Sequence, residues 1–243
     1  MTVRAPAVVA EDVWKAFGPA PVLRGISLSV PPGSAVAILG PNGSGKSTLL
    51  GVLATVFRPS RGRVRIYGED PFSERAARGM IGFVAHEPML YGQLSALENL
   101  QLFASLYGLR DARARAVEAC DVVGLRHRHA PVHRLSRGLQ QRAALARAIV
   151  HAPQVLLLDE SLTGLDPEAR DRLCAFLQGF LARGGTVIMA THSPAEALLV
   201  ADHGYVLTGG RLGDRRPLGG LDAEALQAWY RAAVPAMVRE TVR

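Results

Sequence analysis

The sequence predicts an α/β fold built on a parallel sheet, and three observations support it. Short apolar runs at 35–39, 155–158 and 186–190 have the length and composition of buried strands. Helical signals follow each run, and alternation of strands and helices is typical of parallel sheets covered by helices. A glycine-rich turn at 40–45 joins the first run to the next expected helix. The first two features set the fold class, and the third marks one end of the sheet as a candidate site.

The first third of the chain contains most of the expected strands. Ile26, Leu28 and Val30 alternate with serines, as in a half-buried strand, before a Pro-Pro-Gly turn. The elements expected here are strands at 26–30, 35–39, 64–67 and 81–85 and a helix at 46–56. Together with a small antiparallel sheet near the N-terminus, they form a mixed-sheet core.

A helical subdomain is expected at 86–152, inserted into this core. Ser95 and Glu98 have the spacing of a capping box and open a helix to about residue 107. Asp111 is placed to cap a second helix, and a third begins near Gly138.

The strand and helix pattern then resumes. The core elements expected here are a strand at 155–158, a helix starting at Asp166-Pro167 and a strand at 186–190. We therefore expect one domain over 1–215 and a short helical extension over 216–243, with its helix at 221–234.

Composition excludes several protein classes. The chain has 243 residues, of which 49% are hydrophobic and 20% charged, so it can bury a sizeable core. Its longest apolar runs fall far short of the roughly 20 residues that cross a membrane, and its N-terminus lacks the pattern of a secretory signal. Cys120 and Cys174 show no paired spacing and are expected to be reduced packing residues. The net charge of +7 fits nucleic acid or an anionic membrane surface, and charge alone does not choose.

The glycine-rich turn has the full phosphate-loop pattern between a strand and a helix. Its backbone amides can surround phosphates, Lys46 can reach the outer phosphates, and Ser47 can bind magnesium. A chance glycine turn is disfavoured because both flanking elements are present. The residues expected to bind a nucleotide here are Gly40, Pro41, Asn42, Gly43, Ser44, Gly45, Lys46, Ser47 and Thr48.

Two carboxylates and a histidine are predicted at the same sheet edge. Asp159 ends the strand at 155–158 and Glu160 follows it, so both should lie beside the phosphate loop. Asp159 is the candidate magnesium ligand, and capping of a buried strand is the alternative. His192 follows the strand at 186–190 and has a comparable position. By contrast, His127, His129 and His133 favour a solvated basic loop over a metal site, because no Cys or carboxylate accompanies them.

The order of these motifs resembles the ATP-binding-cassette (ABC) family. Besides the phosphate loop and Asp159-Glu160, the resemblance rests on Leu135-Ser136-Arg137-Gly138 and covers about 8–212. It implies ATP and Mg²⁺ as cofactors. It also implies that Ser136 and Gly138 contact ATP held by a second copy, so the protein should work as a homodimer or paired with a similar subunit.

The resemblance also assigns individual roles. Lys46, Glu160 and His192 are the implied catalytic residues, with Glu160 polarising the attacking water and His192 bonding the γ-phosphate. Asp166, in Gly164-Leu165-Asp166, would cross the dimer interface, which is compatible with helix capping. Phe17 would stack on adenine, with an apolar core position as the alternative.

The chain departs from the family pattern at several positions. His86 occupies the place of the family's glutamine that senses magnesium and water. We therefore expect its side chain to contact both the metal ion and the nucleotide. Arg137 and Leu139 replace the usual glycine and glutamine, and Ser161 replaces proline. The segments 86–88 and 94–100 resemble the ATP-binding subunit of heme exporters in cytochrome c maturation, while 136–142 also resembles other small multidrug or ion exporters.

The sequence thus predicts an ATPase subunit that dimerises around two Mg-ATP and drives export by integral membrane subunits. The resemblance implies heme export for cytochrome c biogenesis, with a multidrug, ion or lipid exporter as the alternative. It should lie peripherally on the cytoplasmic face of the cell membrane, with residues 87–91 contacting those subunits or forming an ordinary loop. A soluble cassette acting on nucleic acid is the alternative, but neither a second cassette nor a long coiled coil is present, so no nucleic acid is expected. A regulator without turnover is disfavoured by Glu160 and His192.

Overall fold

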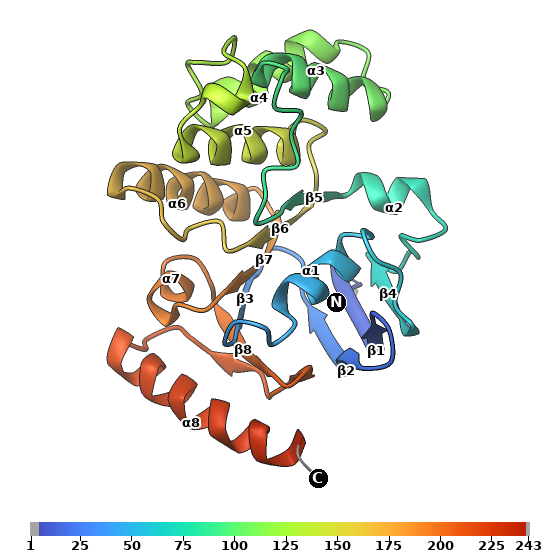
Figure 1. The fold of residues 1–243 in the computed structure, drawn as a ribbon, viewed down its shortest axis with the longest axis vertical. Helices are drawn as coiled ribbons and strands as arrows, with labels where there is room; N and C mark the ends of the chain where they lie inside the picture. Colours follow the sequence, from blue (N-terminus) through green and yellow to red (C-terminus); the bar gives the residue numbers. More distant parts are fainter. Residues whose placement is uncertain (1–4, 242–243) are drawn as a thin grey trace.

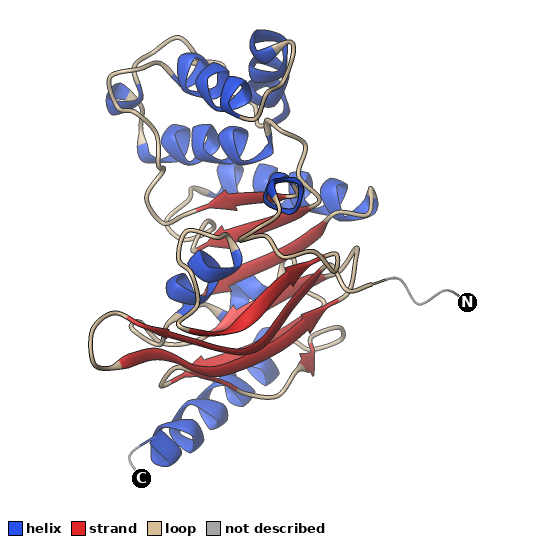
Figure 2. Ribbon diagram, turned by 90° about the vertical axis from the view of Figure 1, so that its right-hand side faces the viewer, coloured by secondary structure: helices blue, strands red, loops and turns tan. Residues whose placement is uncertain are grey.

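The computed structural model describes residues 5–241, with side chains described up to residue 234, and contains two sheets with helices around them (Figures 1 and 2). The smaller sheet has the order β2-β1-β4 and is antiparallel. Its strands are β1 (Val8–Ala16), β2 (Pro21–Val30) and β4 (Arg61–Ile66). The larger sheet has the order β10-β8-β3-β7-β6-β5, with β9 paired to β8. Its strands are β3 (Ala35–Leu39), β5 (Ile81–Val84), β6 (Val155–Asp159), β7 (Thr186–Thr191), β8 (His203–Thr208), β9 (Arg211–Leu212) and β10 (Arg216–Pro217).

Five strands of the larger sheet, β8, β3, β7, β6 and β5, are parallel. β3 lies between β7 and β8, and β6 lies between β7 and β5. Because the carboxyl ends of parallel strands meet at one edge, the segments after β3, β6 and β7 come together there. This topology positions the candidate site.

Each face of the larger sheet packs against a different layer. Along β3, Val36 and Ile38 face a core shared with the small sheet and α1 (Lys46–Leu53), while the alternate residues face the other helices. The helices on that second side are α6 (Pro167–Ala182), α7 (Pro194–Leu198) and α8 (Ala223–Thr241). Both faces are therefore covered, which explains why β3, β6 and β7 are buried along their whole length and mostly apolar.

A helical region lies beyond the β5 edge of the larger sheet, at the top of Figures 1 and 2, and α5 packs against β5. It comprises α3 (Ala96–Leu106), α4 (Ala112–Val122), the 3-10 turn η1 (Val132–Arg134) and α5 (Arg137–Ile149). The capping box of Ser95 and Glu98 is confirmed, since Glu98 N donates to Ser95 Oγ at 3.2 Å and Ser95 N donates to Glu98 Oε2 at 2.7 Å. Asp111 is the N-cap residue of α4, as predicted, but its side chain makes no capping hydrogen bond.

Several elements differ from the sequence expectations. β4 begins at Arg61 because its first residues pair with β1 near a bulge at Asp12, and Gly62 is needed where a Cβ would lie 2.1 Å from Asp12 O. The helix expected at 46–56 ends at Leu53, just before Thr55 at a φ of 63°. β8 and the short helices α2 (Arg75–Gly79) and α7 were not anticipated. Arg216–Pro217 pairs with β8, so the expected extension starts inside the main sheet. Within residues 5–241 no helix has the length and apolarity needed to cross a membrane.

Candidate functional site

The phosphate-loop segment between β3 and α1 is a tight backbone cradle. Gly43 and Gly45 have φ values of 78° and 106°, which favour glycine. A Cβ on Gly40 would lie 2.4 Å from Leu207 O, so only glycine fits between this loop and β8. Lys46 is 5% exposed, and its Nζ donates to Gly40 O at 2.9 Å and to Pro41 O at 3.2 Å. The loop therefore holds its lysine inside the cradle.

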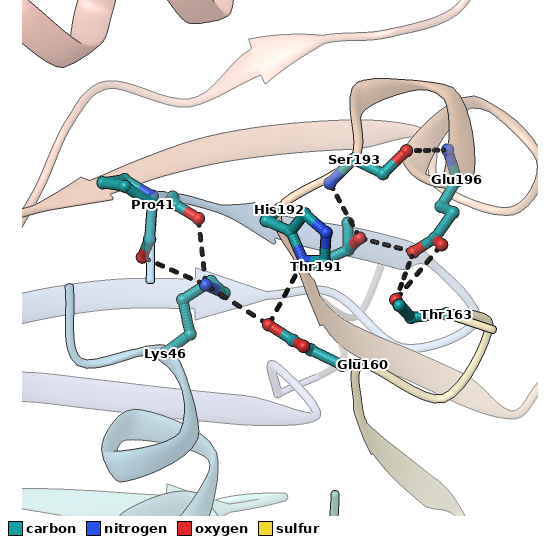
Figure 3. Close-up of polar contacts among 9 residues, drawn as sticks. Pro41, Lys46, Glu160, Thr163, Thr191, His192, Ser193 and Glu196 are labelled. Carbon is teal, nitrogen blue, oxygen red and sulfur yellow. Dashed lines mark hydrogen bonds and ion pairs between the residues drawn. The ribbon is translucent and has the colours of Figure 1, made fainter. Parts of the chain in front are cut away.

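The three predicted catalytic side chains meet at the expected sheet edge (Figure 3). Glu160 Oε1 lies 3.6 Å from Lys46 Nζ and 3.4 Å from His192 Nδ1. Glu160 has a φ of 49° and its amide donates to Ala190 O at 3.0 Å, which fixes this segment against β7. A non-glycine residue in the left-handed region carries strain and is frequent at functional sites. The arrangement leaves one carboxylate between a buried cation and a half-exposed imidazole.

Asp159 and Ser47 offer oxygen ligands beside this group. Asp159 is 3% exposed, and burial raises its carboxyl pKa, while a hydrogen bond with Ser47 opposes the rise. Its Oδ1 has no hydrogen-bond partner among the described residues. A buried carboxylate oxygen without a partner, next to a hydroxyl and a phosphate cradle, fits magnesium, which binds few protein oxygens and keeps the rest of its shell for phosphate and water.

A cavity of about 490 Å³ opens over the cradle. Its walls are Val22, Asn42, Gly43, Gly45, Lys46, Ser47, Thr48, His86 and Glu160. The exposed side chain of His86 thus reaches the same space as the phosphate loop, although it follows β5 at the far end of the sheet order. The cavity can hold a polyphosphate among backbone amides, a lysine and a carboxylate.

Phe17 does not line this cavity. Its ring is 53% exposed, meets Phe57 edge-on with centroids 5.1 Å apart, and lies 4.8 Å from Lys15 Nζ. The alternative that Phe17 is a core residue is therefore wrong. Stacking on adenine stays a prediction.

The residues Ser136, Gly138 and Asp166 form a separate group outside the cavity. Ser136 is exposed and caps α5, accepting from Leu139 N at 3.4 Å, while Asp166 caps α6, accepting from Ala169 N at 2.8 Å. A Cβ on Gly138 would lie 3.9 Å from Asp166 Oδ2, so the two caps are neighbours. Arg137 lies beside Gly164, which explains how an arginine fits here.

None of the three histidines of the basic segment, His127, His129 and His133, lines the nucleotide cavity. His133 Nδ1 lies 2.8 Å from Gly92 O, a local contact with the preceding loop. Across the described residues no group of three or more His, Cys, Asp or Glu side chains is arranged to hold a metal ion.

Glu196 is a site residue that the sequence reasoning missed. Its carboxylate accepts from Thr191 Oγ1 at 2.5 Å and from Thr163 Oγ1 at 3.2 and 3.3 Å (Figure 3). Thr191 Oγ1 accepts in turn from Ser193 N at 3.0 Å. One carboxylate thus joins the segment after Glu160 to the segment that carries His192. A helix start with Ser193 as cap and Glu196 three residues later was the available signal.

We expect Glu196→Gln to lower the ATP turnover number about tenfold while the KM for ATP stays the same, since an amide NH₂ cannot accept these bonds and misplacement of reacting groups is costly. Steady-state kinetics on purified protein measures this split. Glu224→Gln, at an exposed position on α8, is the control. An unchanged turnover number would show that the link does not position His192.

The chain is similar to known proteins in both sequence and structure. Residues 23–163 match the family model described as ABC transporter. The Nod factor export ATP-binding protein I of Paraburkholderia xenovorans (strain LB400) is 37% identical over 209 residues, covering 84% of this chain and 69% of that protein. The Fe(3+) ions import ATP-binding protein of Agrobacterium fabrum (strain C58 / ATCC 33970) is 39% identical over 216 residues, covering 87% of this chain and 61% of that protein. A dimeric ATP-binding cassette solved in a post-hydrolysis state with ADP and phosphate superposes with a TM-score of 0.79 at 28% identity, covering 88% of this chain and 100% of that one.

Proposed function

Because this chain belongs to the ABC transporter family as an ATP-hydrolysing subunit, we propose that two copies close around two Mg-ATP and drive export through separate membrane subunits. One observation carries the shared-site part of this proposal. Lys46 and Glu160 line one cavity, with His192 beside Glu160, whereas Ser136 and Gly138 lie outside that cavity and Ser136 is exposed. In a dimer, Ser136 and Gly138 can contact the ATP that the second copy holds.

The residues of the cradle suggest how hydrolysis proceeds. Lys46 and the loop amides would bind the outer phosphates and stabilise the charge that develops on them. Glu160 would orient the attacking water and accept its proton, and His192 would donate to a γ-phosphate oxygen. Ser47 and Asp159 would hold magnesium, which neutralises phosphate charge when it is bound. His86 would contact the phosphates or their magnesium from the β5 side.

The cargo of the proposed exporter is a separate part of the proposal. Heme is the candidate suggested by residues 86–88 and 94–100, with export of another small molecule as the alternative. The two curated relatives described above are named for Nod factor export and Fe(3+) import, so their names do not add to the heme assignment. We keep heme as a proposal, testable by heme loading of the complex that co-purifies with this subunit.

A groove of about 870 Å³ is the proposed docking site for the membrane subunits. It lies between the end of α1, α2 and β5 on one side and α3 and α5 on the other. Met89, in the segment expected to contact those subunits, lines the groove and is 47% exposed. Leu90 instead packs against the core, so Met89 is the cleaner residue to change. Docking here would hold the subunit peripherally on the cytoplasmic face of the membrane.

We expect Met89→Glu to abolish co-purification of the subunit with its membrane partners, because it places a charge in the apolar part of the groove. ATP binding should be unchanged, as measured by nucleotide titration. Leu199→Glu, at an exposed apolar residue directly after α7 and outside the groove, is the matched control. Intact complexes with Met89→Glu would exclude this groove as the contact.

His151, which lines the groove, should make stability depend on pH. Its ring stacks on Tyr107 at 3.8 Å, its Nε2 bonds Ile81 O at 2.9 Å, and its Nδ1 has no partner among the described residues. Burial and, to a smaller extent, the charge of Arg147 lower its pKa from 6.5 to about 4, against the opposing effect of the hydrogen bond with Ile81 O. Between these two values the unfolded chain binds a proton that the folded protein does not, so stability falls as the pH falls.

We therefore expect the free energy of unfolding to decrease by about 2 to 3 kcal/mol from pH 7 to pH 4 through this residue alone. His151→Phe keeps an aromatic ring against Tyr107 and should flatten that part of the pH profile. Urea unfolding at several pH values compares the two proteins. Parallel profiles for both would contradict the role of His151.

A further inference from the structure

A second cavity, of about 330 Å³, lies behind the Ser136 and Gly138 edge. It lies between α5 and the end of α4 on one side and β5, β6 and α6 on the other. Its floor is formed by buried residues that include Val84, Leu158 and Leu173, and its mouth by the exposed Val122 and Ala175. The volume falls within the roughly 300 to 1,000 Å³ of small-molecule sites. It lies near the same sheet edge as the nucleotide cavity, but no residue lines both cavities.

The walls are mostly apolar, yet one buried hydroxyl among them is unsatisfied. Ser161 is 5% exposed, lines the cavity, and its Oγ has no hydrogen-bond partner among the described residues. Leaving a buried hydroxyl unpaired costs free energy, so a group that bonds it should bind favourably. Ser161 stands where the family pattern has proline, which has no hydroxyl to offer.

The charged residues of the cavity wall favour an anion. Asp121 is paired with Arg128 at 2.7 Å, and Arg172 is paired with Glu168. Arg142 has no carboxylate within ion-pair distance among the described residues, and its guanidinium reaches only Gly124 O at 3.5 Å. One uncompensated cation therefore faces an otherwise apolar space.

We propose that this cavity binds a small amphipathic acid. Its carboxylate or sulfonate pairs with Arg142, its aliphatic or aromatic body lies on the apolar walls, and Ser161 donates to one of its polar atoms. Because the walls come from both the helical region and the sheet core, an occupant bridges the two parts of the subunit.

The test uses the fluorescent anion anilinonaphthalene sulfonate with the full chain. We expect saturable binding to wild type and at least tenfold weaker binding to Arg142→Gln, which loses a charge-assisted contact, and to Ala175→Trp, which fills the mouth. Arg113→Gln and Ala182→Trp change exposed residues outside the cavity and should bind as wild type. ATP titration of each variant checks that it is folded.

Competition tests the acid. Decanoate should displace the dye from wild type, whereas decanol, with the same chain length and no charge, should displace it at least tenfold less well. Unchanged dye binding in both Arg142→Gln and Ala175→Trp would place the dye elsewhere and overturn the site. Equal displacement by decanol would overturn the requirement for an anion.

Discussion

Glu160→Gln is expected to lower ATP turnover by a factor of about 10² to 10⁴, the usual contribution of a positioned general base. The amide preserves the shape of the side chain but cannot accept a proton from water. ATP binding should remain, because the cradle and Lys46 are unchanged. Without hydrolysis the closed dimer should persist, so size-exclusion chromatography with Mg-ATP should show a stable dimer that wild type forms only transiently.

The matched control is Glu168→Gln, which removes an exposed carboxylate from the first turn of α6. Surface ion pairs contribute little, so its turnover should equal that of wild type. A Glu160→Gln protein that binds ATP and still turns over within tenfold of wild type would remove Glu160 from the general-base position.

Ser136→Arg is expected to abolish ATP-induced dimerisation and hydrolysis while leaving ATP binding to the single subunit intact. Ser136 is exposed and lies outside the nucleotide cavity, so a large cation there should not disturb the chain's own phosphate loop. It should instead obstruct ATP held by the facing copy. Ser73→Arg, at another exposed serine far along the chain, controls for added bulk and charge.

Mixing two inactive variants gives a sharper test of the shared site. Lys46→Ala loses the phosphate contact in its own cradle, and Ser136→Arg loses the contact to the partner. A heterodimer of the two has one site with both residues intact and one with both defects. We expect ATPase activity to return on mixing. Activity that stays absent on mixing, or Ser136→Arg that hydrolyses ATP alone, would contradict the shared site.

Local patterns predicted the strands that carry the candidate site. β3, β6 and β7 are apolar on both faces because helices or the small sheet cover them, and such runs are readable without an alignment. The phosphate loop was readable because its glycines are required by backbone conformation and by close approach, as at Gly40. The capping box at Ser95 depends on residues three apart and was equally accessible.

Contacts between distant segments were not readable in the same way. The start of β4 at Arg61 depends on pairing with β1, and the missing capping hydrogen bond of Asp111 depends on its backbone conformation. The carboxylate of Glu196 joins Thr163 to Thr191 only because β6 and β7 are neighbours in the sheet. The spacing of Ser193 and Glu196 indicates a helix start, but no local spacing shows that Glu196 contacts Thr163.

The sequence by itself determined the fold class, the cradle for phosphate and the identity of the carboxylates and histidine beside it, because these depend on local periodicity, glycine geometry and residue chemistry. Tertiary structure decided which side chains touch. It placed Glu160 between Lys46 and His192, brought His86 into the cavity that Lys46 and Glu160 line, kept Ser136 outside that cavity, and left Ser161 and Arg142 on a second one. Those outcomes follow from strand order and helix packing, which join residues far apart in the chain.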